Sequence, residues 1–314
     1  MGILAVIGSF ETVSLPTNRR RVRYVIGVDG GGTGTRARLT RLDGEALGYA
    51  QAGPSALGQG VEQAWRNVSQ AIEHSFRDAT VDDWDPGECA IGLGLAGAIV
   101  ASHSRDFLYA ASRYAHVALA SDGFTTLLGA HKGKPGAIVI AGTGSIGEAL
   151  LPNGTHVFIG GWGYPIGDEG SGAWLGMYAM RRTQQAVDGR VSAGALVRAV
   201  QSVAGNTRDE LLAWCERAGQ HAYATLAPLV FDVETADTYA AELLNAAARS
   251  IDDIAVALDA DGTLPLVVSG SIGQRLEPRL TPRVRARLVE PAGDAIDGAL
   301  RLIRERLRGD GIVS

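Results

Sequence analysis

The feature that most constrains the fold of this chain is a glycine-rich turn directly after an apolar segment, and it occurs twice. Residues 24–28 lead into Asp29-Gly30-Gly31-Gly32-Thr33-Gly34-Thr35, and residues 136–141 lead into Gly142-Thr143-Gly144-Ser145. A short apolar segment bounded by a turn is typical of a buried strand. Glycines have no Cβ, so backbone N–H groups at such turns can approach an anion. Each turn is therefore a candidate phosphate-binding loop at the end of a strand.

A similar succession of elements surrounds both turns. Asp43-Gly44 and Asn153-Gly154 are two-residue hairpin signals between strand-like segments, and helices then alternate with strands. This pattern predicts an α/β protein with two similar domains and a ligand-binding cleft between them. The expected strands are residues 24–29, 35–42, 45–51, 89–96, 116–120, 136–141, 146–151, 155–159, 264–268 and 284–289; the expected helices are 61–79, 102–114, 240–258 and 296–307, with another beginning near residue 173.

Composition excludes several classes of partner. The 29 basic and 34 acidic residues give a net charge of −5, so no basic surface for nucleic acid is expected. No apolar run reaches the ~18 residues of a membrane span, and residues 3–7 lack the flanking features of a signal peptide. Cys89 and Cys215 form no CxxC pair, which is typical of cytosolic usage. We therefore expect a cytoplasmic protein.

The first glycine-rich turn carries a carboxylate. Asp29 stands where a Mg²⁺ shell would need a hard oxygen ligand, directly or through water, and Thr33 adds a hydroxyl donor. The turn lacks the GKS or GKT end of a Walker A loop and is not a GxGxxG fingerprint. A plain hairpin explains one or two glycines but not four beside two threonines. We therefore favour a phosphate and metal site.

Two other small-residue turns are ambiguous when taken alone. The turn at residues 142–145 indicates a plain hairpin as readily as a phosphate loop, but paired with the first it favours a polyphosphate held from both sides. Ser269-Gly270-Ser271-Ile272-Gly273 follows a predicted strand and opens a helix. This arrangement suits a nucleoside or phosphate at the helix N-terminus, and equally well tight strand–helix packing.

Carboxylates also occur in one predicted loop and directly after one predicted strand. In residues 160–172, aromatic residues and the acids Asp168 and Glu169 precede a helix, which suits a polyol ring, although either acid could instead cap the helix. Asp122 lies directly after the strand at residues 116–120, where ligands bind in α/β sheets. From position alone, Asp122 is equally well a catalytic residue or a helix N-cap.

Together and in this order, the motifs resemble the actin-like sugar-kinase and Hsp70 ATPase superfamily. Four stretches look like the N-acetylglucosamine kinases and bacterial glucosamine kinases of the BadF/BadG/BcrA/BcrD-type ATPase family: GLAGA at 94–98, ASDG at 120–123, AGTGS at 141–145 and GGWGYPIGDEGSG at 160–172. The resemblance covers residues 22–307. It implies two actin-like (ribonuclease H-like) domains with an interdomain cleft for ATP and sugar.

The resemblance also implies an activity and a set of roles. It implies transfer of the γ-phosphate of ATP to the 6-hydroxyl of N-acetylglucosamine or glucosamine, with Asp122 as the base that also contacts the sugar. Mg²⁺ and the terminal phosphates would be held by Asp29, Gly31, Gly32 and Thr33, and the second phosphate loop would consist of Gly142, Thr143, Gly144 and Ser145. The adenosine would lie by Gly270 and Ser271. The sugar would contact Gly161, Trp162, Gly163 and Asp168.

The chain departs from this family pattern at one position. These kinases have an asparagine near the end of the third strand that contacts the sugar, whereas Ala56 or Leu57 stands there in this chain, with Ser55 as the residue that could compensate. The identity of the sugar therefore stays open. An alternative is an ATPase that activates a radical dehydratase or reductase through an Fe–S cluster shared by cysteines, but Cys89 and Cys215 are far apart in sequence.

The domain boundaries follow from the order of the elements. We expect residues 1–22 to form a flexible extension, residues 23–125 and 293–310 an N-terminal domain, and residues 126–292 a C-terminal domain. The expected partners are a small sugar, ATP and a second copy of the chain in a homodimer, with no nucleic acid and no membrane.

Overall fold

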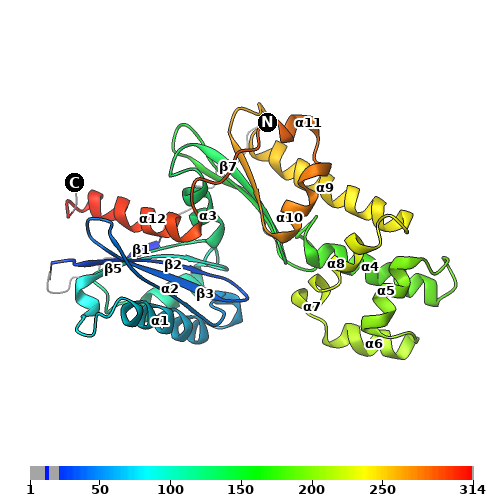
Figure 1. Ribbon diagram of the computed structural model, residues 1–314, viewed down its shortest axis with the longest axis horizontal. Helices are drawn as coiled ribbons and strands as arrows, with labels where there is room; N and C mark the ends of the chain where they lie inside the picture. Colours follow the sequence, from blue (N-terminus) through cyan, green and yellow to red (C-terminus); the bar gives the residue numbers. More distant parts are fainter. Residues whose placement is uncertain (1–10, 14–20, 313–314) are drawn as a thin grey trace. The chain divides into compact units, whose positions relative to one another are not determined.

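The computed structural model describes residues 11–13 and 21–312 of the chain, and these residues form two compact units (Figure 1). The first unit comprises the described residues up to 136, residues 150–156 and the segment from residue 290 onward. The second comprises residues 137–149 and 157–289. Each unit contains helices and one sheet, so the predicted α/β class with two sheets is confirmed.

The first unit is built on a six-stranded sheet with the order β1-β6-β5-β2-β3-β4. Strands β2, β5 and β6 are parallel, whereas β3, β4 and the edge strand β1 run antiparallel to their neighbours. The strands are β1 (Glu11–Val13), β2 (Tyr24–Gly30), β3 (Thr35–Arg41), β4 (Ala46–Ala52), β5 (Cys89–Leu95) and β6 (His116–Ala120).

Helices cover both faces of this sheet (Figure 1). Helices α1 (Val61–Asp78) and α2 (Ala101–Ala110) pack on one face, and α3 (Asp122–Ala130) and α12 (Ala295–Gly309) pack on the other. Strand residues alternate between the two cores, so Ile26 joins the α1 side while Val25 joins the α12 side. Helix α12 lies close to the sheet because Gly92 has no side chain: a Cβ there would lie 2.0 Å from the Ala299 carbonyl oxygen.

The predicted flexible extension at residues 1–22 falls largely outside the described residues. Within that segment, Glu11–Val13 pair with β6, and the side chain of Val22 is buried in the core beside α12. These described parts of the segment therefore belong to the fold of the first unit.

The second unit has a four-stranded sheet with the order β10-β7-β8-β9, in which β10 and β7 are parallel. The longest helix, α9, buries the predicted apolar face that runs from Ala240 to Leu258. The elements are β7 (Gly136–Ala141), β8 (Ser145–Leu150), β9 (His156–Gly160), β10 (Leu266–Ser269), α4 (Gly172–Val187), α5 (Ala195–Ala204), α6 (Arg208–Arg217), α7 (Gln220–Ala224), α8 (Ala227–Asp232), α9 (Thr238–Leu258), α10 (Ser271–Leu276) and α11 (Pro282–Arg285).

One predicted strand is wrong. Residues 284–289 were expected to be a strand, but Val284 lies in the short helix α11, and only Leu288 makes a bridge to Leu266 of β10. Pro282 occupies the start of this helix, where its missing N–H costs nothing. None of the helices in the described part of the chain is both long and apolar enough to span a membrane.

Candidate active site

The first glycine-rich loop joins β2 to β3 and exposes its backbone. The Gly31 N–H donates to the Gly34 carbonyl (3.0 Å), which closes the turn. Gly32 and Thr33 are exposed, and a Cβ at Gly31 would meet no atom within 4 Å. The space in front of the loop is therefore open to an anion, as the predicted role of Gly31, Gly32 and Thr33 requires.

A buried hydroxyl pair supports this loop from behind. The Thr35 hydroxyl donates to the Gly53 carbonyl (2.6 Å) and lies 2.7 Å from the Ser55 hydroxyl, and the Ser55 N–H donates to the Gly31 carbonyl (3.0 Å). Ser55 is only 1% exposed. The Ser55 hydroxyl therefore lies behind the loop. The predicted contact between Ser55 and the sugar would need an exposed hydroxyl, so the structure does not support it.

Asp29 lies at the end of β2 and is paired with an arginine of the next strand. The Arg36 Nε and Nη2 atoms both donate to Asp29 Oδ2, at 3.0 and 2.5 Å, because the two residues are direct cross-strand partners. Burial raises the pKa of Asp29, and the hydrogen bond from Arg36 offsets part of that increase. Asp29 thus offers one partly buried carboxylate beside the loop.

Asp122 lies at the same edge of the sheet as the first loop. Strands β2, β5 and β6 are parallel and in register, with Gly30 opposite Leu95 and Gly94 opposite Ala120, so their carboxyl ends align. The loop after β2 and Asp122 after β6 therefore both lie at the carboxyl edge of the parallel strands, where α/β sheets bind ligands.

Asp122 was also a candidate for the N-cap of α3, but the neighbouring Ser121 occupies that position. The Ser121 hydroxyl accepts a hydrogen bond from the Phe124 N–H (3.0 Å) and is the N-cap of α3. Asp122 is the first residue of the helix, and its carbonyl accepts bonds from the hydroxyls of Thr125 and Thr126. The carboxylate of Asp122 therefore does not act as the helix cap.

In the second unit, three predicted loops meet. The Gly142 carbonyl accepts from the Gly172 N–H (2.8 Å) at the start of α4, and the Thr143 carbonyl accepts from Ala173 (3.1 Å). Gly270 has a positive φ of +84°, and a Cβ there would lie 2.3 Å from the Ala141 carbonyl oxygen. The 142–145 loop, the start of α4 and the turn with Gly270 and Ser271 are thus one packed cluster.

Asp168 is anchored to the loop at residues 142–145. Its carboxylate accepts from the Ser145 N–H (3.2 Å) and from the Gln220 Nε2 (2.7 Å), and it is 4% exposed. Burial raises the pKa of Asp168, with the Ser145 and Gln220 donors opposing the increase. The cap of α4 is Ser171, which accepts from the Trp174 N–H. Ser145 is also buried, and its hydroxyl donates to the Glu169 carbonyl.

The predicted sugar loop exposes two large apolar side chains. Trp162 is 84% exposed and Ile166 is 87% exposed, whereas Gly161 packs against Ile146, and its N–H donates to the Ser145 carbonyl. An exposed aromatic face beside glycines can pack on the C–H face of a sugar ring.

Sequence reasoning missed the contacts that α6 and α7 make with this region. Besides the bond from Gln220 to Asp168, the Tyr223 ring lies 5.5 Å from the Tyr164 ring and 5.1 Å from the Trp214 ring. Helix α7 has five residues, too few for an apolar period to reveal which side it buries.

The two cysteines lie in different units of the chain. Cys89 is fully buried in β5, where burial raises the pKa of its thiol to about 12, and Cys215 lies in α6 of the other unit. In the described part of the chain, no group of three or more His, Cys, Asp or Glu side chains could hold a metal ion.

Comparisons with known proteins identify a family and several relatives of this chain. The model of the BadF/BadG/BcrA/BcrD ATPase family matches residues 26–277. A glucosamine kinase of Vibrio cholerae is 36% identical over 280 residues, covering 89% of this chain and 95% of the relative. The crystal structure of a candidate N-acetylglucosamine kinase from Chromobacterium violaceum is 48% identical with a TM-score of 0.87, covering 90% of this chain and 99% of that chain.

A more distant structure shares the fold. The hexokinase of the ROK type from Thermus thermophilus is 18% identical with a TM-score of 0.52, covering 90% of this chain and 98% of that chain. The family model spans well over half of the sequence, including the first glycine-rich loop, Asp122 and the cluster of loops in the second unit. The chain belongs to the BadF/BadG/BcrA/BcrD ATPase family.

Proposed function

We propose that this protein is an ATP-dependent amino-sugar kinase that transfers the γ-phosphate of ATP to the 6-hydroxyl of N-acetylglucosamine or glucosamine. The observation that carries the proposal is Asp122, a carboxylate at the end of a parallel strand that is not used as a helix cap. The similarity to a glucosamine kinase over nearly the whole chain supports the same reaction class.

Asp122 would act as the base. A sugar hydroxyl is a poor nucleophile and must lose its proton as the new P–O bond forms, so a carboxylate must accept that proton. The proton leaves the 6-hydroxyl oxygen and is held on Asp122, while the phosphoryl group leaves the β-phosphate oxygen of ATP. In this proposal Trp162, Gly161, Gly163 and Asp168 hold the sugar.

The residues present fit a nucleotide with Mg²⁺. Mg²⁺ is usually bound by one or two carboxylates together with phosphates and waters rather than by a protein cage, and Asp29 offers one such carboxylate. When bound, the ion would neutralise phosphate charge. Gly31 and Gly142 have open space where a Cβ would stand, so their loops can approach phosphates. The phosphates would also contact Gly32, Thr33, Thr143 and Gly144, and Ser145 would contribute from the base of its loop. The adenosine would lie by Gly270 and Ser271.

A coupled assay of ADP release tests the activity. We expect ADP release that depends on glucosamine or N-acetylglucosamine and exceeds the rates with glucose and N-acetylmannosamine. The Asp122→Asn variant is the control for contaminating kinases. ADP release that ignores all four sugars would contradict the proposal, and an Fe–S spectrum from anaerobically purified protein would favour a dehydratase activator.

The proposal also includes a cytoplasmic homodimer. Light scattering after size-exclusion chromatography should give about twice the 32.8 kDa mass of one chain. A mass of one chain at working concentration would contradict this part alone.

A further inference from the structure

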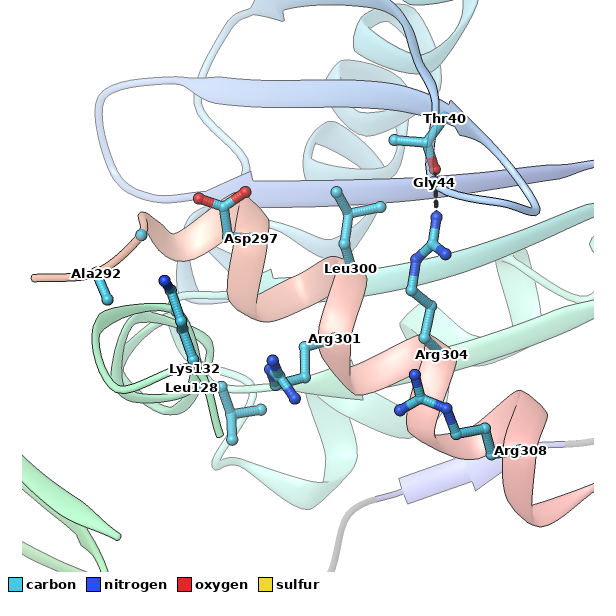
Figure 2. A pocket seen from close by; sticks show the side chains of 12 residues that line it. Thr40, Gly44, Leu128, Lys132, Ala292, Asp297, Leu300, Arg301, Arg304 and Arg308 are labelled. Atoms are coloured by element: carbon cyan, nitrogen blue, oxygen red, sulfur yellow. Dashed lines mark hydrogen bonds between the residues drawn. The ribbon is translucent and has the colours of Figure 1, made fainter. Parts of the chain in front are cut away.

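A cationic hollow lies beside α12 in the first unit, away from the loops described above. It has a volume of about 450 Å³ (Figure 2). Arg301, Arg304 and Arg308 line it from α12, and their spacing of three and four residues places them on one face of the helix. Lys132 enters from the turn after α3, and Leu128 adds an apolar side chain.

These cations lack strong acidic partners. In the described part of the chain, Lys132 and Arg308 make no ion pair, and Arg301 has only Glu305 at 3.5 Å on the exposed helix surface. The Arg304 guanidinium donates to the Thr40 hydroxyl (Figure 2) and to the Leu42 and Arg41 carbonyls, none of which carries charge.

The single carboxylate of the lining is already engaged. Asp297 pairs with Arg38 at 2.5 Å and accepts the Asp294 N–H at 3.0 Å in the capping box of α12. Burial and then the nearby Arg308 lower the pKa of Arg304, and the Asp43 carboxylate offsets part of that decrease. The hollow therefore has a surplus of positive charge that an anion would relieve.

The adjoining hollow has a different charge balance. It shares Arg304 and Arg308 and is also lined by Arg21, Arg23, Arg41 and the carboxylate of Asp43. Arg23 pairs with Glu88 and Arg41 pairs with Glu45. Its volume is about 790 Å³, larger than that of the first. The first hollow differs in containing Lys132, which makes no ion pair in the described part of the chain, and Arg301, which pairs with the half-exposed Glu305.

The backbone at Lys132 adds an independent reason. Lys132 has a φ of +52°, and the Gly133 N–H donates to the Leu128 carbonyl while the Lys132 N–H donates to Gly129. These two bonds form a Schellman motif, in which glycine is strongly preferred at the position that Lys132 occupies. A lysine at this position carries backbone strain that glycine would avoid.

Helix dipoles explain part of the cluster. Arg308 lies in the last turn of α12 and Lys132 follows the end of α3, where positive charge is favoured. That effect fades within one turn, so it does not account for Arg301 and Arg304.

We propose that this hollow is a binding site for a small phosphate ester with a second anionic group. Two guanidinium groups can donate paired hydrogen bonds to phosphate oxygens, Lys132 can neutralise the second anion, and Leu128 and Leu300 can pack against the carbon body. The volume falls within the usual range for small-molecule sites. The inference does not depend on the proposed kinase activity.

Calorimetric titration of the full chain with 3-phosphoglycerate tests the site. Mg²⁺ and a non-hydrolysable ATP analogue are added first to occupy the nucleotide loops. We expect binding that weakens at least tenfold in Arg301→Ala/Arg308→Ala. The matched control is Arg66→Ala/Arg77→Ala, which removes two exposed arginines from α1 with the same change of net charge. Equal binding by all three proteins, or equal loss in both double variants, would overturn the proposal.

Inorganic phosphate distinguishes the source of the anion. Weaker binding of inorganic phosphate than of 3-phosphoglycerate would support a phosphate ester with a second anion, and equal affinity would overturn that assignment of ligand class. Lys132→Gly gives a further readout, since glycine should raise Tm by about 2–4 °C by removing the backbone strain while weakening 3-phosphoglycerate binding. Unchanged affinity in Lys132→Gly would exclude Lys132 from the site.

Discussion

At the residue scale, Ser121 and Asp122 are adjacent but have separable roles. We expect Asp122→Asn to lower kcat by ~10²–10⁴-fold, because asparagine keeps the size of the side chain but cannot accept the sugar proton. Calorimetric affinities for sugar and ATP should change far less. Ser121→Ala removes the α3 cap and should cost about 0.5–2 kcal/mol of stability with kcat within a few-fold of wild type. If Asp122→Asn also stayed within a few-fold, the base would have to be sought elsewhere, first at Asp168.

Asp168 allows a test of sugar contact against loop support. Asparagine can present its oxygen to only one of the two donors, Ser145 N–H and Gln220, that the carboxylate now satisfies. We expect Asp168→Asn to raise the KM for sugar more than the KM for ATP in steady-state assays. A rise confined to the KM for ATP would reassign Asp168 to the support of the second phosphate loop.

The raised pKa of Asp168 also predicts a pH dependence of stability. Because the native state holds this proton more tightly than the unfolded state, the contribution of Asp168 is complete below its unfolded pKa and is lost as pH rises through its higher native pKa. Asp168→Asn cannot titrate. Urea unfolding at a series of acidic pH values measures the free energy of unfolding of both proteins. We expect the difference, wild type minus Asp168→Asn, to fall as pH rises. A difference that grows with pH would mean that the native state favours the ionised carboxylate.

At the element scale, the packed loops of the second unit depend on Gly270. Alanine there would place its Cβ 2.3 Å from the Ala141 carbonyl oxygen at a φ of +84°, so the loops must separate. We expect Gly270→Ala to cost at least ~1–3 kcal/mol of stability and to raise the KM for ATP. Ser271→Ala, at an exposed neighbour, is the control and should change stability little. A normal KM and Tm for Gly270→Ala would show that this junction is not needed for nucleotide binding.

The elements also show how far the sequence could predict this protein. Local signals were sufficient to predict the strands and turns around both glycine-rich loops, because apolar runs and glycine turns act over a few residues. They failed at residues 284–289, where apolar and charged residues alternate as in a strand but Pro282 begins a helix. The contacts of Ser55 with Thr35 and of Gln220 with Asp168 join residues far apart in the chain, so no local pattern could reveal them.

At the scale of the whole molecule, the predicted roles are divided between the two units. The first unit carries Asp29 and Asp122, whereas the second carries the 142–145 loop and Gly270. The proposed reaction requires both sets of residues to act on one nucleotide and one sugar. It must also keep water from the reactive phosphoryl group, because water would otherwise compete with the sugar hydroxyl.

Closure of the two units on the substrates would meet both requirements, as in other kinases that close on their ligands. We expect the radius of gyration from small-angle scattering to fall when sugar and a non-hydrolysable ATP analogue are added together. Asp122→Asn should show the same compaction, because the substitution spares binding and removes only the proton acceptor. This variant separates closure from turnover, so compaction with lost activity would place the defect of Asp122→Asn in the chemical step. An unchanged radius of gyration in wild type at saturating ligand would count against closure and would leave the exclusion of water to the loops alone.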